Sequence, residues 1–410
     1  MKSPRSSFAS DVGGRVMRGA MWSTVFAFCV FGIMWGACHV LLVDAQRALK
    51  LSDGVLGLSM TLGISASIPS MLLSGRMVDR YGAKAVISVT VLMLAAALER
   101  FATATSLTEF CIALALLYGA SGGYDVAINA AAIHIEQGSS KRILAYFHGS
   151  FSAFAAASGA LCGYLLSEGI PFRVIYSGLA ILLALVCLTI AFNPVLAAVH
   201  RPTQTSEAER GNLRKIVMAP AILLVAAITT LSFLSENALQ TWSSFYLRNY
   251  LGLGAIIGSI GPSASYAAMS LGRFVSGYVI NTLGRVTLLR LAGVCAAVGM
   301  TLALWSRDPH WVIAGFILGG LAQSGIAPTA YSIGGDVSPG HAGRVTSIIT
   351  TIGYTGFLLG PALIGGLAQL SSLRIALGVV ILGGALITLL SFFLKEPRPA
   401  ATDVVSLAPG

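Results

Sequence analysis

Long apolar runs alternate with short charged segments along most of the chain. Each run holds roughly twenty residues or more, enough for a helix to cross a hydrocarbon core ~30 Å thick at ~1.5 Å per residue. The runs predict twelve membrane spans, at residues 20–42, 54–75, 85–105, 108–134, 143–167, 172–193, 216–240, 253–280, 286–306, 309–334, 345–369 and 373–394. We therefore predict an all-α, multi-pass membrane protein.

The composition of the 410 residues excludes several other classes of protein. Apolar residues make up 56% and charged residues 10%, and the mean hydropathy is +0.81. Soluble domains carry roughly 25% charged residues, so a soluble enzyme, a nucleic-acid-binding protein and a secreted disulfide scaffold are excluded. The six cysteines lie inside apolar runs without a C-x-x-C pair or a nearby histidine cluster. They are expected to be small buried apolar residues, with no metal site and no cofactor.

The basic residues predict the orientation of the chain. If the N-terminus is cytoplasmic, the inner segments hold 18 Lys and Arg and the outer loops hold 7. This excess places both termini in the cytoplasm, and we expect the inner membrane of a bacterium as the location. The first apolar run follows four basic residues without a small-residue cleavage site, so it is expected to remain as the first span.

One polar interruption and one internal repeat divide the chain into two halves. The interruption covers residues 200–215, and it predicts a linker between a bundle at 1–199 and a bundle at 216–394, with a cytoplasmic tail at 395–410. A shift of 202 positions superposes Ser74 on Ser276, Gly75 on Gly277, Asp79 on Asn281, Gly82 on Gly284, Arg142 on Arg344 and Gly163 on Gly365. Duplicated six-helix units of this kind enclose a central cavity and rock against each other, which provides alternating access.

The segment G-R-M-V-D-R-Y-G-A-K resembles the signature between spans 2 and 3 of the major facilitator superfamily. Its matching residues are Gly75, Asp79, Arg80, Gly82 and Lys84, whereas Ala83 replaces a basic residue. The resemblance implies twelve helices in two pseudo-symmetric bundles and a cytoplasmic charge gate. In the second copy Asn281 stands where the acid would be, beside Gly284 and Arg285, and we include Arg273 in this gating group. The alternative for Asp79 is a loop charge that only sets topology.

Three further segments narrow the resemblance. They are G-G-Y-D-V-A-I-N-A at 122–130, F-H-G-S-F-S at 147–152 and E-N-A-L-Q-T-W-S-S-F-Y-L-R at 236–248. They resemble the branch of the superfamily that contains the membrane protein MosC, which implies inositol-like or sugar-like solutes. Span 5 lacks the Gly-Pro step of the antiporter signature that drug exporters of the family usually show.

Asp125 is the candidate proton-coupling group of the N-terminal half. It is predicted ~15 Å from the cytoplasmic end of span 4, near the midplane, and Asn129 follows one turn later on the same face. A low-dielectric cavity favours the neutral form of a carboxylate, so Asp125 can gain and lose a proton as the cavity opens to each side. The alternative is a structural Asp held by hydrogen bonds to neighbouring helices.

Glu236 is the corresponding candidate in the C-terminal half. The i, i+4 pairs Glu236 with Gln240 and Asn237 with Thr241 predict a polar stripe toward the cavity, with Trp242 beside it. Amides and carboxylates exchange hydrogen bonds with a polyhydroxylated or amine-bearing solute, and an aromatic face stacks on it. The alternative is an outer helix end with ordinary interfacial aromatic residues.

Three other polar residues are weaker candidates for substrate binding. His148 lies about two turns from the inner end of span 5, where a gate or packing role is equally compatible. His39 lies near the outer end of span 1 with Asp44 one turn beyond, and an interfacial His–Asp pair is expected there. Gln323 in span 10 is a candidate that could instead join helices.

These features predict a secondary active transporter that moves a small polar solute with protons and is not an enzyme. No P-loop is present, so ATP is not expected to drive the cycle directly. Expected partners are the solute, protons and the lipid bilayer, without nucleic acid, and the chain is expected to act as a monomer. The alternatives are a facilitator or exporter of drugs or other amphipathic metabolites on the same fold, and a sensor or membrane enzyme, whose soluble domain or catalytic cluster is not seen.

Overall fold

The chain folds into helices because a backbone in lipid must satisfy its own polar groups. The computed structural model describes residues 4–137, 143–192, 218–337 and 342–395, and within these ranges helices are joined by short turns without a strand. The predicted linker at 200–215, Arg142 and the tail beyond Lys395 lie outside them. The all-α prediction is confirmed.

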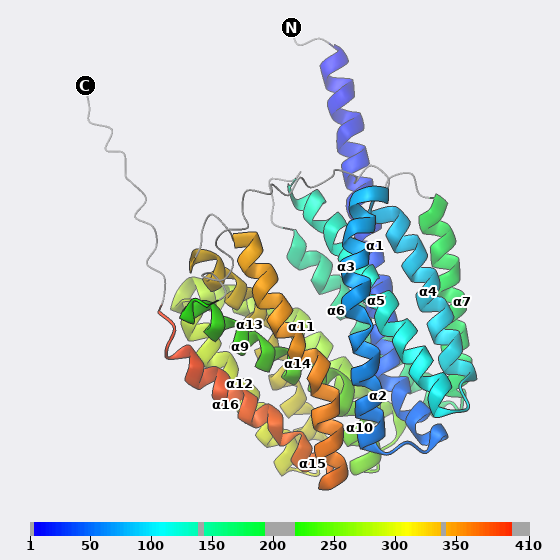
Figure 1. Ribbon diagram of the computed structural model, residues 1–410, viewed down its shortest axis with the longest axis vertical. Helices are drawn as coiled ribbons and strands as arrows, with labels where there is room; N and C mark the ends of the chain where they lie inside the picture. Colours follow the sequence, from blue (N-terminus) through cyan, green and yellow to red (C-terminus); the bar gives the residue numbers. More distant parts are fainter. Residues whose placement is uncertain (1–3, 138–142, 193–217, 338–341, 396–410) are drawn as a thin grey trace.

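The helices form two bundles that are consecutive in sequence (Figure 1). The N-terminal bundle comprises α1 (Pro4–Leu49), α2 (Asp53–Ser65), α3 (Ser67–Tyr81), α4 (Ala83–Thr103), α5 (Leu107–Gln137), α6 (Leu144–Ser167) and α7 (Phe172–Phe192). The C-terminal bundle comprises α9 (Pro220–Asn237), the π-helix η3 (Ala238–Trp242), α10 (Ser243–Phe245), the π-helix η4 (Tyr246–Tyr250), α11 (Ala255–Leu283), α12 (Arg285–Trp305), α13 (Pro309–Val337), α14 (Ala342–Leu370), α15 (Leu373–Ala376) and α16 (Gly378–Ser391).

Twelve of the described segments are long enough to cross a membrane, as predicted. Eleven of them also satisfy the apolarity expected of a span, with α2 continuing into α3, α9 into η4, and α15 into α16. The twelfth is α11, whose 29 residues include Arg273 and five serines. The span with the most polar composition is therefore the one with a cation at membrane depth.

The two bundles repeat the same helix contacts. The pairs α1–α6, α4–α7 and α4–α5 of the first bundle correspond to α9–α14, α12–α16 and α12–α13 of the second. Between the bundles, α6 packs on α11 and α2 packs on α14, which are again corresponding contacts. The start of α1 and the end of α16 lie at the same end of the molecule (Figure 1), and we call the opposite end the distal end.

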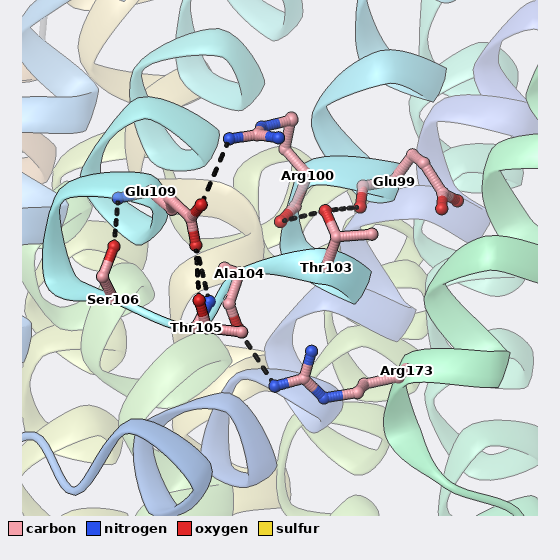
Figure 2. Close-up of polar contacts among 8 residues, drawn as sticks. All are labelled: Glu99, Arg100, Thr103, Ala104, Thr105, Ser106, Glu109 and Arg173. Carbon is pink, nitrogen blue, oxygen red and sulfur yellow. Dashed lines mark hydrogen bonds and ion pairs between the residues drawn. The ribbon is translucent and has the colours of Figure 1, made fainter.

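Helix ends are also terminated alike in the two halves. Gly82 separates α3 from α4 at φ 83°, and Gly284 separates α11 from α12 at φ 89°, a conformation that favours glycine. At the distal end of α4, Arg173 Nη2 donates to the carbonyl of Ala104 at 3.0 Å (Figure 2). Its Nη1 donates to the carbonyl of Ala102 at 2.7 Å. Arg374 donates likewise to the carbonyl of Leu304 at the end of α12, at 2.7 Å. These contacts satisfy carbonyls that a helix end leaves unpaired.

The outer surface carries many large apolar side chains. Leu185, Phe274 and Leu386 are examples of exposed residues of this kind. In water such a surface would aggregate, whereas in a bilayer it contacts acyl chains. The cysteines are free, and Cys29, Cys38 and Cys162 are buried as expected, whereas the other three are only partly buried.

Candidate functional site

A cavity of about 410 Å³ lies between the two bundles. The N-terminal bundle contributes Phe31, Trp35, His39, Ile64, Ser67, Met71, Tyr118, Ser121, Gly122, Asp125, Asn129, His148 and Phe151. The C-terminal bundle contributes Phe233, Glu236, Asn237, Gln240, Tyr266, Met269, Arg273, Gln323, Ser324, Ala327, Pro328, Tyr331, Tyr354 and Phe357. Both predicted carboxylates therefore line one void, and the volume suits a small-molecule ligand.

Asp125 lines the cavity from α5 and has one side-chain partner. Asn129 Nδ2 donates to Asp125 Oδ1 and to the Asp125 carbonyl, each at 2.9 Å. No cation pairs with this carboxylate among the described residues. His148 lines the same wall from α6, and its ring meets Phe28 edge-on with centroids 5.2 Å apart.

The C-terminal wall carries more hydrogen-bonding groups. Gln240 Nε2 donates to Glu236 Oε1 at 2.8 Å, so this predicted i, i+4 pair is confirmed. Gln323 Oε1 accepts from the Ser232 hydroxyl at 2.7 Å. Two buried atoms on this wall, Asn237 Oδ1 and Gln323 Nε2, have no hydrogen-bond partner among the described residues.

Arg273 lines the cavity from α11, whereas we had grouped it with the gate. Its Nη1 donates to the His148 carbonyl at 3.2 Å and to the Ser152 hydroxyl at 3.0 Å, and both acceptors belong to α6. The guanidinium therefore joins the bundles at the level of the cavity, where Glu236 attracts it electrostatically.

A stack of three rings in the cavity lining joins α1 to α11. Trp35 stacks on His39, and His39 stacks on Tyr266, with centroid distances of 5.2 and 5.9 Å. The Tyr266 hydroxyl lies 3.0 Å from His39 Nδ1, which joins α1 to α11. The expected pair of His39 with Asp44 is not formed, because Asp44 binds Arg248 instead.

Beyond this stack, polar side chains join the bundles at the distal end. Arg248 donates from Nη1 and Nη2 to the two carboxylate oxygens of Asp44, at 2.6 and 2.7 Å. Arg47 Nε donates to Asn249 Oδ1 at 2.9 Å, and Asn249 Nδ2 donates to Gln46 Oε1 at 2.8 Å. We call these residues, Asp44, Gln46, Arg47, Arg248 and Asn249, the distal lock.

Trp242 ends the π-helical turn η3 and does not line the cavity. Trp242 is fully buried and packs against Phe245, with ring centroids 5.4 Å apart. Thr241 is also fully buried, and its hydroxyl has no partner among the described residues, so the predicted pair with Asn237 is not formed. A π turn holds more than the usual 3.6 residues, so side chains beyond it no longer follow the α-helical stripe.

The other residues of the gating group lie away from the cavity. Asp79 and Arg80 are exposed, and the Arg80 guanidinium lies over the Tyr81 ring at 5.2 Å. Arg285 pairs with Asp336 of its own bundle at 2.6 Å. Gly75, Gly82 and Lys84 of the first copy, and Asn281 and Gly284 of the second, are likewise not among the lining residues.

Most of the aromatic lining was not predicted. Rings inside an apolar run look like lipid-facing residues, and Trp35, Tyr118 and Tyr266 gave no polar signal. The internal repeat did contain a signal for part of this lining. A shift of 202 positions carries the predicted residues Asn129, Asn237, Arg273 and Gln323 onto Tyr331, Trp35, Met71 and Ser121, and all four of these line the cavity.

A second hollow, of about 540 Å³, is a poor candidate for a polar site. It is lined by α1, α6, α7 and the turn between the last two, almost wholly with apolar side chains such as Phe154, Leu161 and Leu182, which are exposed on the outer surface. No carboxylate, histidine, lysine or arginine belongs to it.

Comparison with known proteins agrees with this architecture. The family model described as Major Facilitator Superfamily matches residues 24–303 and 259–408. An uncharacterized MFS-type transporter of Yersinia pestis is 29% identical over 88% of this chain and 92% of its own. The membrane protein MosC of Rhizobium meliloti is 24% identical over 97% of this chain and 98% of its own, which confirms the resemblance seen in the sequence. A crystal structure of the nucleoside transporter NupG has a TM-score of 0.69 at 17% identity, over 92% of this chain and 98% of that one, and shares the fold.

Proposed function

This chain belongs to the major facilitator superfamily of membrane transporters, and we propose that it is a secondary active transporter that moves a small polar solute together with protons. The solute passes by alternating access and is not chemically changed. The coupled groups are Asp125 and Glu236, one from each bundle.

The observation that supports this proposal is the cavity that both bundles line. A carboxylate at membrane depth is costly, on the order of 2.5 to 3.5 kcal/mol, so a carboxylate kept there usually marks a site or a pathway. Asp125 has a single amide partner and Glu236 has another, so both can exchange protons with water in the cavity. Rocking of the bundles about the α6–α11 and α2–α14 contacts would present them to each side in turn.

The excess of basic residues in alternate segments supports cytoplasmic termini. With that orientation the distal end faces outward, and the distal lock closes the cavity from outside. The structure then corresponds to an inward-facing state, in which Asp79 is exposed. Closure of the cytoplasmic side would bring Asp79 into contact with basic groups of neighbouring helices.

The substrate class is a polyhydroxylated ring, of the sugar or inositol type. Amides at Asn237, Gln240 and Gln323 can exchange hydrogen bonds with hydroxyls, and the face of Trp35 can stack on a ring. The resemblance of residues 122–130, 147–152 and 236–248 to the MosC branch implies the same class.

Asp125→Asn tests the coupling role. A solute is first chosen by thermal-shift screening of the purified protein against sugars, inositols, amino sugars and organic acids. In proteoliposomes with an imposed proton gradient, we expect the accumulation ratio of this variant to fall to about one, because an uncoupled carrier only equilibrates its solute. Counterflow exchange should continue.

Asp308→Asn is the matched control, since Asp308 is an exposed acid of the loop before α13. It should accumulate solute as the parent does. Loss of both accumulation and exchange in Asp125→Asn, or of neither, would refute the coupling role.

A second candidate function, export of amphipathic molecules, is favoured by the nine aromatic rings of the lining. Direction of transport separates the two. Everted vesicles that load solute in response to a proton gradient would favour export, whereas right-side-out vesicles that load it would favour uptake.

A further inference from the structure

Arg273 is the single basic side chain, apart from the two histidines, among the residues described as lining the cavity. It is partly exposed there, although most of its side chain is enclosed by α11 and its neighbours. A cation at membrane depth costs free energy, on the order of a few kcal/mol, unless partners or water offset it, so a cation kept there usually marks a function.

The guanidinium uses only one of its three nitrogens. Nη1 donates to the His148 carbonyl and the Ser152 hydroxyl, whereas Nε and Nη2 make no bond with the described residues. These two nitrogens form one edge of the planar group. That edge matches the two oxygens of a carboxylate.

Neither resident carboxylate occupies this edge. Glu236 accepts a hydrogen bond from Gln240, and Asp125 accepts one from Asn129. No ion pair within 4 Å joins either acid to Arg273 among the described residues. The guanidinium is thus held in place by neutral acceptors, and its free edge remains available to a ligand.

Two other helices, α13 and α9, each contribute a neutral amide with an atom that has no hydrogen-bond partner among the described residues. Gln323 on α13 is 3% exposed and presents an unpaired Nε2 donor, and Asn237 on α9 is 6% exposed and presents an unpaired Oδ1 acceptor. A buried polar atom without a partner is costly, and because both residues line the cavity, a bound ligand can satisfy them. A hydroxyl can accept from one and donate to the other.

We propose that the transported solute is a polyhydroxylated carboxylic acid, such as a sugar acid, whose carboxylate binds the free edge of Arg273 and whose hydroxyls bind Asn237 and Gln323. This inference rests on the proposed transport function and narrows its substrate class from neutral polyols to their acids.

The titratable groups that share the cavity with Arg273 couple binding of the solute anion to protonation. Asp125 from α5, Glu236 from α9, His148 from α6 and His39 from α1 share the cavity with it. An anion is repelled by the two acids when they are ionised and is favoured when they are protonated. Binding of the solute anion should therefore tighten as the pH falls from 7.5 to 5.5.

The test measures binding to the full chain in lipid nanodiscs, with three sets of probes. They are sugar acids (D-glucuronate, D-galacturonate and D-gluconate), the methyl esters of the two uronates, and the neutral sugars D-glucose and D-galactose. We expect at least one uronate to bind about tenfold tighter than its ester, since a charge-assisted pair is lost in the ester. Arg273→Gln should abolish this preference and Arg273→Lys should retain part of it.

Arg290→Gln is the control, because Arg290 stacks on Phe392 at 4.3 Å and does not line the cavity. Wild-type protein that binds no acid tighter than its ester or parent sugar would overturn the inference without any variant. So would an Arg273→Gln protein that keeps the preference.

Transport separates this inference from the function on which it rests. Proton-driven accumulation of a neutral sugar, equal in the parent and in Arg273→Gln, would overturn the acid assignment and leave the transport function intact. Failure of the parent to accumulate any probe against its gradient would count against both.

Discussion

The two bundles share a frame but differ in the chemistry that they present to each other. Outside the cavity the same contacts recur. Cys187 Sγ meets the Ser88 carbonyl and Thr388 Oγ1 meets the Arg290 carbonyl, both at 3.3 Å, and the arginine caps and the glycines between helices recur as well. Inside the cavity the same positions are used with different side chains.

Nine pairs of lining residues are related by the shift of 202 positions. They are Phe31 and Phe233, Trp35 and Asn237, Ile64 and Tyr266, Ser67 and Met269, Met71 and Arg273, Ser121 and Gln323, Gly122 and Ser324, Asp125 and Ala327, and Asn129 and Tyr331. One pair is identical. Position within the fold therefore decides which residues reach the cavity, and divergence between the halves decides what they bind.

The largest effect is expected when the carboxylate of Asp125 is moved from the N-terminal bundle to the C-terminal bundle. In the double variant Asp125→Ala, Ala327→Asp the acid moves to the corresponding position of the other bundle, where Tyr331 stands in place of Asn129. We expect the accumulation ratio to fall to about one, because the acid loses its amide partner. Gradient-driven uptake in proteoliposomes measures it. Restored accumulation would mean that the halves are functionally interchangeable.

A smaller effect is expected when the arginines that bond to the ends of α4 and α12 are removed, because these contacts recur in both bundles. Arg173→Ala removes two charge-assisted hydrogen bonds and is expected to cost about 3 kcal/mol of unfolding free energy, against about 1.5 kcal/mol for the single bond of Arg374→Ala. Denaturant unfolding in detergent measures both. Arg307→Ala, at an exposed position before α13, is the control and should be near neutral. A larger loss for Arg374→Ala would contradict the assignment.

The glycines that end α3 and α11 should give the smallest and most nearly equal effects. Their positive φ and extended ψ are essentially confined to glycine, so Gly82→Ala and Gly284→Ala should each cost about 1 kcal/mol of unfolding free energy. Gly178→Ala on α7, where nothing lies near the added carbon and φ is not positive, is the matched control. If only one of the two substitutions were costly, the turns would not be equivalent.

The fold was largely predictable because its signals are local. Apolar length predicts a span, and a constant shift predicts a repeat, so all twelve spans were found, including α11, although the helices of the first and seventh spans extend well beyond their predicted ends. Asp125, Glu236, Asn237 and Gln323 were found as lining residues for a related reason, since each is a polar residue inside an apolar run.

The remaining parts of the site depend on geometry that local patterns do not carry. Trp242 was expected in the cavity because a regular helix would place it there, and the π turn η3 that changes its direction has no recognised sequence signal. His39 was expected to bind Asp44, its neighbour in sequence, whereas its partner Tyr266 lies 227 positions away. Arg273 was grouped with the gate although it lies inside the predicted span 253–280, and its place in the cavity became clear only from the packing of α11 on α6.

The composition of α11 has a consequence for how the protein is made. As this segment leaves the ribosome, its arginine and five serines oppose entry into lipid, by on the order of 2.5 to 3.5 kcal/mol for a centrally placed arginine alone. The preceding helices can offset this by offering polar partners such as Ser152 and the His148 carbonyl on α6. Newly made chains with a damaged α6 should therefore leave α11 uninserted and be degraded, so that such mutations lower the yield of protein before any defect in its activity can be measured.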